Sequence, residues 1–245
     1  MFISVVRVSS AVSLVQWLVL IGAAFFPPLV YVVWIRNTER CHREKWAAIA
    51  VCFLWGASIA IIAAIILEVV LDVSVTISAQ EGSFLQVLAT IMIAPFAEEL
   101  IKPMALRTRS VRRELNEPED GLIYGAVAGL GFSATENLFY GFSFLSYGFA
   151  TFVIYMVIRS VGGCLLHASA TALTGYGYGL TVLKKRSVLR VVPYFVMAML
   201  AHGLYNFLVS WETIGVVTGL FLAFILVFFM IRYVRRKIQT LDGYC

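Results

Sequence analysis

Seven ionisable residues lie deep inside the long apolar stretches of this 245-residue chain. They are Glu98, Glu99, Lys102, Glu136, Arg159, His167 and His202. A charged residue at the centre of a membrane helix raises the free energy of insertion by roughly 2.5 to 3.5 kcal/mol, so such groups normally face the interior of a bundle and mark a functional site. We therefore expect these side chains to meet inside the protein.

Four short polar patterns carry the chemistry, on four consecutive apolar stretches. They read EExxK from Glu98, FxxxEN around Glu136, HxxxT from His167, and HxxxN from His202 to Asn206. Hydrolysis of a peptide bond inside a membrane needs a water molecule, a base that activates it and a group that stabilises the oxyanion. Glutamate and histidine supply the base, and histidine with asparagine supplies the oxyanion contact. Together the patterns predict a hydrolytic site.

The same residues also suit a metal ion. Two histidines and one carboxylate with an open fourth position form a catalytic zinc site, in which water reaches a pKa of about 7. His167, His202 and Glu136 would be the ligands, and Glu99 or Glu98 would remain as the base. The chain has no HExxH pattern, the usual arrangement of two zinc ligands on one helix. A zinc-dependent and a glutamate-based hydrolase therefore both stay open.

Helical geometry separates the two adjacent glutamates. Glu98 and Lys102 lie four residues apart and share one face, whereas Glu99 points about 100° away. We expect an ion pair between Glu98 and Lys102 and a different neighbour for Glu99. Pro95 and Pro103 bracket this segment, and each proline frees a backbone carbonyl of the preceding turn.

Small residues predict which helices pack closely. Glycines recur at every fourth residue from Gly121 to Gly129, and Glu136 lies seven residues further on nearly the same face. Such a face permits close contact between helices. His167 belongs to a second stripe of small and polar residues on the next apolar stretch. Arg159 precedes this stripe, either as a structural counter-ion or as a clamp for the substrate.

The composition is that of a membrane protein. Hydrophobic residues make up 61% of the chain and charged residues 13%, against about 45 to 50% and 25% in soluble domains. Apolar stretches claim almost the whole length, so residues 1–245 are expected to form a single integral membrane domain, multi-pass in the cell membrane. The site region is expected to span residues 84–210.

A membrane span needs roughly 20 mostly apolar residues. We predict an all-α polytopic bundle of about seven transmembrane helices, over residues 14–35, 46–67, 84–105, 121–141, 149–182, 191–211 and 214–232. The fifth stretch is too long for one upright helix and is expected to tilt or to extend beyond the bilayer. A short surface helix is expected in the polar segment 107–120.

Basic residues orient the bundle, because Lys and Arg near the ends of spans are retained in the cytoplasm. Four basic residues follow each of the first, third, fifth and seventh spans, so every second connection is basic. We therefore predict an outside N-terminus and a cytoplasmic C-terminus. This topology, with contact to anionic lipid, accounts for the net charge of +5. No basic and aromatic surface indicates nucleic acid as a partner.

At these residues the chain resembles the PrsW intramembrane proteases, which are distantly related to the CAAX-processing and bacteriocin-immunity membrane proteases. The resemblance covers residues 84–210, through APFAEELIKP, GFSATENLFYG, LLHASATALTGYGYG and AHGLYNF. It implies an active-site set of Glu98, Glu99, Glu136, His167 and His202. It also implies an oxyanion role for His202, Asn206 or both, although Glu136 stands where the distant relatives have a histidine. The best-known role in the family is the first cleavage of a membrane-anchored anti-sigma factor.

We therefore predict an intramembrane endopeptidase, of the metallo- or glutamic type, that cuts a membrane-anchored protein near the bilayer surface. The main alternative is a proton- or cation-coupled carrier, because buried Glu and His residues also form proton relays. No inverted repeat supports a carrier. A third alternative is a noncatalytic scaffold or immunity-type protein, in which the polar residues only hold helices together. Each interhelical polar contact contributes under about 1 kcal/mol on average, so burying this many ionisable residues would be unfavourable for that role alone. The substrate, the role of the metal and the oligomeric state stay open.

Overall fold

The computed structural model describes residues 13–78, 84–185, 187–210 and 215–243. Over these residues the protein consists of helices and their connections, without strands. The helices are α1 (Leu14–Arg36), α2 (Trp46–Trp55), α3 (Ile61–Ser78), α4 (Phe84–Ile101), α5 (Arg109–Arg112), α6 (Asp120–Leu145), α7 (Phe149–Ile158), α8 (Cys164–Leu183), α9 (Val192–Ser210) and α10 (Val216–Leu241). The prediction of an all-α fold is confirmed.

Shorter turns join some of these helices end to end. The π-helical turns η1 (Gly56–Ala60) and η3 (Arg159–Gly163) connect α2 to α3 and α7 to α8. The 3-10 turns η2 (Lys102–Arg107) and η4 (Val188–Val191) follow α4 and precede α9. Because Pro103 cannot donate a hydrogen bond to the preceding turn, the end of α4 tightens into η2. The short helix expected within 107–120 is α5.

Five helical stretches of the described residues are long and apolar enough to cross a membrane. They are Leu14–Arg36, Trp46–Thr76, Phe149–Leu183, Val188–Ser210 and Val216–Leu241. The spans expected at 84–105 and 121–141 are also helical, as α4 with η2 and as α6, but are not among these five. The last helix is longer than expected, because it continues past the predicted end at residue 232 to Leu241. Its basic residues therefore lie on a helix and not in a loop.

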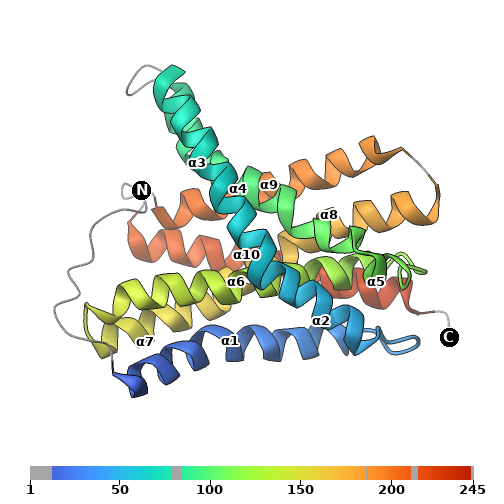
Figure 1. Ribbon diagram of the computed structural model, residues 1–245, viewed down its shortest axis with the longest axis horizontal. Coiled ribbons are helices and arrows are strands. Elements are labelled where there is room, and N and C mark those ends of the chain that lie inside the picture. The colour runs from blue at the N-terminus through green and yellow to red at the C-terminus, as the bar shows by residue number, and fades with distance from the viewer. Residues whose placement is uncertain (1–12, 79–83, 186, 211–214, 244–245) are drawn as a thin grey trace.

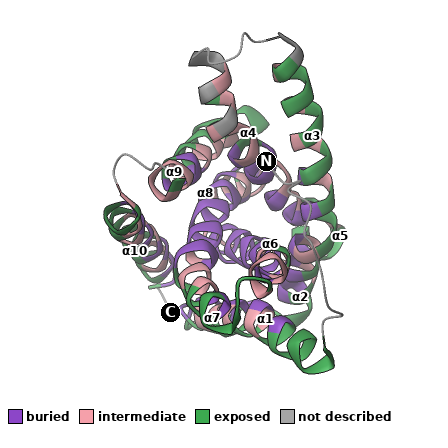
Figure 2. Cartoon of the chain, turned by 90° about the vertical axis from the view of Figure 1, so that its left-hand side faces the viewer, coloured by how far each residue is buried: buried purple, intermediate pink, exposed green. Residues whose placement is uncertain are grey.

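Two helices form the centre of the bundle. Figure 2 shows α6 and α8 buried along most of their length and surrounded by the other helices. The expected glycine face of α6 lets these two helices approach closely. A Cβ atom at Gly125 would lie 2.5 Å from the carbonyl oxygen of Thr171, and one at Gly129 would overlap the carbonyl oxygen of His167. The glycines of α6 thus bring its backbone against α8. This close packing fixes the turn of α8 that carries His167.

The long helix α2–α3 leaves the general direction of the bundle. In Figure 1 most helices run across the picture, whereas α2–α3 crosses them steeply and its outer half projects with the first part of α4. At 31 residues and 1.5 Å of rise per residue, this helix is about 46 Å long, and a bilayer of about 30 Å accommodates such a helix by tilt.

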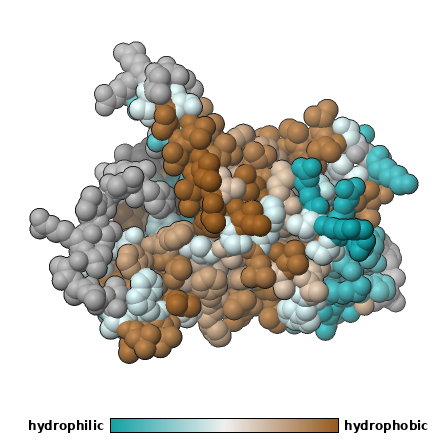
Figure 3. All heavy atoms as spheres, viewed as in Figure 1, coloured by the Kyte–Doolittle hydropathy of each residue, from teal (hydrophilic) through white to brown (hydrophobic). Residues whose placement is uncertain are grey.

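The surface divides into an apolar belt and one polar end. Figure 3 shows hydrophobic residues over most of the visible face and hydrophilic residues gathered at the right-hand end. In Figure 1 this end carries the α1–α2 connection, α5 and the α8–α9 connection. Large apolar side chains such as Phe26, Val69 and Phe221 are more than half exposed on the helices. An exposed apolar belt of this kind is expected where lipid is the solvent.

Candidate active site

The end of α4 and the first residue of η2 present three charged side chains to the interior. Nζ of Lys102 lies 2.7 Å from Oε2 of Glu98 and 2.9 Å from Oε1 of Glu99. Lys102 and Glu99 are fully buried, and Glu98 is 8% exposed at its side chain. The expected pair of Glu98 and Lys102 is therefore present. Lys102 also reaches Glu99, because residues three apart are neighbours on a helix as well.

Glu99 joins the facing helices α8 and α9. Its Oε2 accepts a hydrogen bond from Oγ1 of Thr171 at 2.9 Å, and its Oε1 lies 3.0 Å from Nδ1 of His202. The expected separate neighbours of Glu99 are thus residues of α8 and α9. Both carboxylate oxygens of Glu99 are engaged, which holds this side chain in one orientation.

The two histidines stand edge to face at the centre of the cluster. Their ring centroids are 4.9 Å apart with an angle of 89° between the ring planes. Nδ1 of His167 lies 2.8 Å from Nζ of Lys102 and 3.6 Å from Oε2 of Glu98. Nε2 of His202 lies 3.9 Å from the same oxygen of Glu98. The side chains of His167 and His202 are 3% and 2% exposed, so the contacts form out of water.

Glu136 of α6 approaches His167 from the opposite side. Its Oε2 lies 2.8 Å from Nε2 of His167 and 2.5 Å from a terminal nitrogen of Arg159. Nε of Arg159 donates to Oδ1 of Asn137 at 2.7 Å. Arg159 is therefore a counter-ion to Glu136, held by the neighbouring asparagine. Both charged side chains are mostly buried, at 14% and 16% exposure.

Four of these residues form a group of metal-ligand type. One atom each from Glu98, Glu99, His167 and His202 lies within 4.8 Å of the others. Glu136, expected as a ligand, is not part of this group, because it contacts the far nitrogen of His167 and pairs with Arg159. The group contains two imidazoles and two carboxylates, and all four residues are buried.

Asn206 is the expected site residue that stays apart from the cluster. It lies one turn after His202 on α9 and is partly buried. Among the described residues no hydrogen bond joins Asn206 to the cluster. Its position on α9, one turn after His202, is the expected one.

Three contributions to the cluster were not predicted from the sequence. Lys102 was expected as the partner of one glutamate, yet it contacts three members of the cluster and lies 4.2 Å from the centroid of the Phe132 ring. Thr171 belongs to the HxxxT pattern of the sequence, but its hydrogen bond to Oε2 of Glu99 was not predicted. Glu68 of α3 lies close enough to interact electrostatically with Glu98. It falls just beyond the predicted end of the second span.

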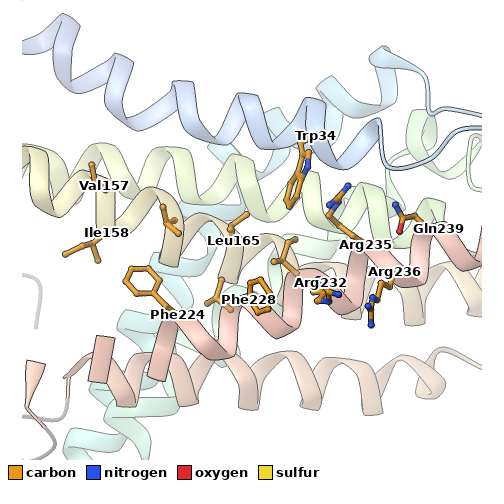
Figure 4. A pocket seen from close by; sticks show the side chains of 13 residues that line it. Trp34, Val157, Ile158, Leu165, Phe224, Phe228, Arg232, Arg235, Arg236 and Gln239 are labelled. Carbon is orange, nitrogen blue, oxygen red and sulfur yellow. The ribbon is translucent and has the colours of Figure 1, made fainter. Parts of the chain in front are cut away.

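A groove of about 840 Å³ lies elsewhere, between α1, the junction of α7 with α8, and α10. Figure 4 shows Phe224, Phe228 and Leu165 along its apolar length and the arginines of α10 at one end. None of the buried glutamates or histidines lines this groove. It is therefore separate from the candidate site.

Comparisons with known proteins point to one family. A family model described as "PrsW family intramembrane metalloprotease" matches residues 44–233. The chain is 29% identical over 121 residues to "Protease PrsW" of Clostridioides difficile, a match that covers 49% of each chain. It is 31% identical over 113 residues to "Protease PrsW" of Geobacillus kaustophilus, covering 44% of this chain and 46% of the relative. The chain thus spans about half the length of the curated relatives it matches. No solved structure matches it.

Proposed function

Because the chain belongs to the PrsW family of intramembrane metalloproteases, we propose that it hydrolyses a peptide bond of a membrane-anchored protein at the buried glutamate and histidine cluster. The matched region contains every residue of that cluster. The substrate we propose is a single-span protein of the anti-sigma-factor type, cut where its chain meets the bilayer surface.

One observation carries this proposal. Glu98 and Glu99 of α4, His167 of α8 and His202 of α9 converge within 4.8 Å, although each is buried. Burying ionisable groups is unfavourable unless they are paired. Polar contacts between helices stabilise a membrane protein only slightly, so helix packing does not explain this burial. Two carboxylates and two imidazoles in contact are the components that peptide hydrolysis requires. A purely structural role would not need four buried ionisable side chains in contact.

The donors in the cluster fit a zinc ion. Zinc in catalytic sites takes nitrogen and oxygen ligands from His and Glu and keeps one position open. The ammonium group of Lys102 already lies within 2.9 Å of three of the four donor residues, so the cluster accepts a positive charge. We propose that His167, His202 and Glu99 hold the zinc, in place of the expected set with Glu136. A bound zinc ion supplies Lewis acidity and lowers the pKa of water to about 7.

The remaining side chains then have separate tasks. Glu98 is the more exposed of the two glutamates and makes fewer hydrogen bonds than Glu99. We therefore assign Glu98 as the base that accepts the proton of the attacking water at Oε2. The pair of Glu136 and Arg159 orients the ring of His167 through its Nε2. Asn206 donates to the developing oxyanion once a substrate is bound.

We propose that α4 and α6 also cross the bilayer, which gives seven transmembrane helices. The polar end carries the basic connections, so it faces the cytoplasm, with the N-terminus outside and the C-terminus inside. The residues of the cluster lie on α4, α8 and α9, which are all helices of the proposed membrane part. The substrate segment must therefore enter between helices.

Cleavage of single-span substrates by the purified protein in lipid nanodiscs tests the proposal. We expect Glu98→Gln, His167→Ala and His202→Ala to lower the rate by about 100-fold or more. The matched control is Glu114→Gln, a glutamate that pairs with the exposed Lys45 outside the cluster. Wild-type cleavage by all three site variants would overturn the assignment of the site.

Metal analysis of the same preparations tests zinc separately. We expect about one zinc per chain in the wild type and a loss of zinc in His167→Ala and His202→Ala. Active protein that contains no zinc would remove the metal from the proposal and leave a mechanism based on Glu98 alone.

A further inference from the structure

A second cluster of carboxylates lies at the polar end, away from the candidate site. It joins the α1–α2 connection to the segment before α6 and to the first residue of α6. One oxygen each of Glu39, Glu117 and Asp120 lies within 4.8 Å of the others. Glu39 is 0% exposed and Asp120 is 2% exposed. Glu119, 2% exposed, follows Glu117 and interacts electrostatically with Glu39.

The fold holds these carboxylates by backbone contacts. Oδ2 of Asp120 accepts hydrogen bonds from the N–H groups of Asn116 at 2.7 Å and Glu117 at 2.8 Å. Oε2 of Glu39 accepts from the N–H group of Glu44 at 3.1 Å. Each of the two carboxylates therefore has one oxygen fixed by the backbone. The arrangement is preformed and does not depend on flexible side chains.

Two buried carboxylate oxygens of this region have no hydrogen-bond partner in the described part of the chain. Oε1 of Glu39 and Oε2 of Glu119 are enclosed and accept no hydrogen bond among the described residues. A buried acceptor without a partner costs about 1 to 3 kcal/mol. Native proteins rarely retain such atoms, and a bound ion or water is a common explanation. The oxygen of Glu39, a member of the group of three carboxylates, therefore favours a bound ion.

Among the described residues, no basic side chain forms an ion pair with Glu39 or Asp120. Arg36 and Arg43 lie close, but their Nε atoms donate to the backbone carbonyls of Glu44 at 2.6 Å and Glu39 at 3.1 Å. Among the described residues the ion pairs of this region involve only the outer glutamates, as in the contact of His42 with Glu117 at 3.4 Å. Within the part of the chain that the structure describes, the buried carboxylates thus have no ion-pair partner.

We propose that Glu39, Glu117 and Asp120 bind a hard divalent cation, Ca²⁺ or Mg²⁺. The donors are all carboxylate oxygens, the ligands that these hard ions prefer, and the group has no histidine or cysteine of the kind zinc sites use. Calcium binds oxygen at 2.3 to 2.6 Å, so ligands on opposite sides of one ion lie about 5 Å apart. One oxygen of each of the three residues lies within 4.8 Å of the others, so a single ion can contact all three. The cation ties the α1–α2 connection to the start of α6, and it does not depend on the proposed catalytic site.

Calcium binding to the purified full-length protein tests the proposal directly. The protein is stripped with a chelator and titrated with radioactive Ca²⁺ in equilibrium dialysis, with Mg²⁺ as competitor. The variant His167→Ala/His202→Ala serves as the background, so that ions at the candidate active site do not contribute. We expect saturable binding of one Ca²⁺ per chain and a higher unfolding temperature when the ion is present. Absence of saturable binding of either ion would overturn the proposal, whatever the fate of the proposed protease activity.

Two variants locate the ion. Glu39→Gln and Asp120→Asn should each lower the affinity at least tenfold and remove the cation-dependent rise in unfolding temperature. Glu114→Gln, in the same segment as Glu117 but paired with Lys45, should bind as the wild type does. Unchanged affinity in Glu39→Gln and Asp120→Asn would overturn the assignment. If Asp120→Asn fails to fold, Glu39→Gln decides the question, because its Oε1 has no structural contact to lose.

Discussion

Nζ of Lys102 lies 2.8 Å from Nδ1 of His167. A lysine ammonium group only donates, so Nδ1 of His167 is the acceptor and carries no proton. The neutral ring then holds its proton on Nε2, which donates to Glu136 at 2.8 Å. Lys102 and Glu136 thus select one tautomer of His167. Nδ1, the nitrogen that faces Lys102 and Glu98, is the one able to bind a metal ion.

Replacing Lys102 by methionine should separate its two effects. In metal-free protein the variant leaves Glu98 and Glu99 buried without their cation, and breaking a buried pair costs about 3 to 5 kcal/mol. We therefore expect a clearly lower unfolding temperature. In zinc titrations the same variant should bind at least about tenfold tighter, because a competing positive charge is gone.

Lys45→Met is the control for this prediction. The side chain of Lys45 is 71% exposed and pairs with Glu114, and exposed pairs contribute about 0 to 1 kcal/mol. Neither stability nor zinc affinity should change measurably. Equal zinc affinity of Lys102→Met and the wild type would mean that Lys102 does not compete with the metal.

Arg159 should act by positioning Glu136 and, through it, His167. Arg159→Met leaves the carboxylate of Glu136 unpaired, so we expect a loss of about 3 kcal/mol of stability together with loss of cleavage. Adding Glu136→Gln removes the unpaired charge and should restore most of the stability without restoring cleavage. Thermal unfolding and cleavage rates of both variants check this. A double variant that cleaves like the wild type would contradict a role for this pair in catalysis.

The polar end should make the stability of chelator-treated protein fall with rising pH. Burial, together with repulsion from Glu119, Asp120 and Asp242, raises the pKa of Glu39 from 4.5 to about 7. The folded state therefore binds more protons than the unfolded state between these pH values. The contribution of Glu39 to the free energy of unfolding is fully present below about pH 4.5 and is lost as the pH rises through 7. A shift of this size corresponds to at most about 3 kcal/mol. Unfolding temperatures between pH 4.5 and 8 measure the slope.

Glu39→Gln should flatten this pH dependence, because its amide does not titrate. Glu114→Gln should leave the slope as in the wild type. An unchanged slope in Glu39→Gln would show that another group titrates in this range.

Much of the fold and the membership of the site could be predicted because both depend on one physical quantity, the cost of polar groups in an apolar medium. Apolar length indicated the positions of the helices. The same cost indicated that Glu98, Glu99, Glu136 and His167 would meet inside. The glycine face of α6 identified its close partner through a steric argument that needs only the spacing of four residues.

The relative positions of side chains on different helices could not be predicted. Helical periodicity states which face a residue occupies, but not which atom of a neighbour it meets. It therefore did not show that Lys102 lies between the glutamates and His167, or that Glu136 meets the far nitrogen of the ring. The contact between Glu39 and Asp120 brings together residues 81 positions apart in loops and helix ends, where no periodic pattern exists. The basic residues in these loops predicted only the orientation of the helices in the membrane.

The contact between α6 and α8 gives the most direct test of how the fold positions the site. A methyl group at Gly129 would overlap the carbonyl oxygen of His167, whereas one at Gly22, also in an apolar helix, would meet nothing within 4 Å. Gly129→Ala must therefore push the helices apart, at a cost of about 1 to 3 kcal/mol, and move His167 away from Glu99 and His202. We expect a lower unfolding temperature and a loss of cleavage in Gly129→Ala, and wild-type values in Gly22→Ala. Equal cleavage by the two variants would mean that the spacing of α6 and α8 does not control the geometry around His167.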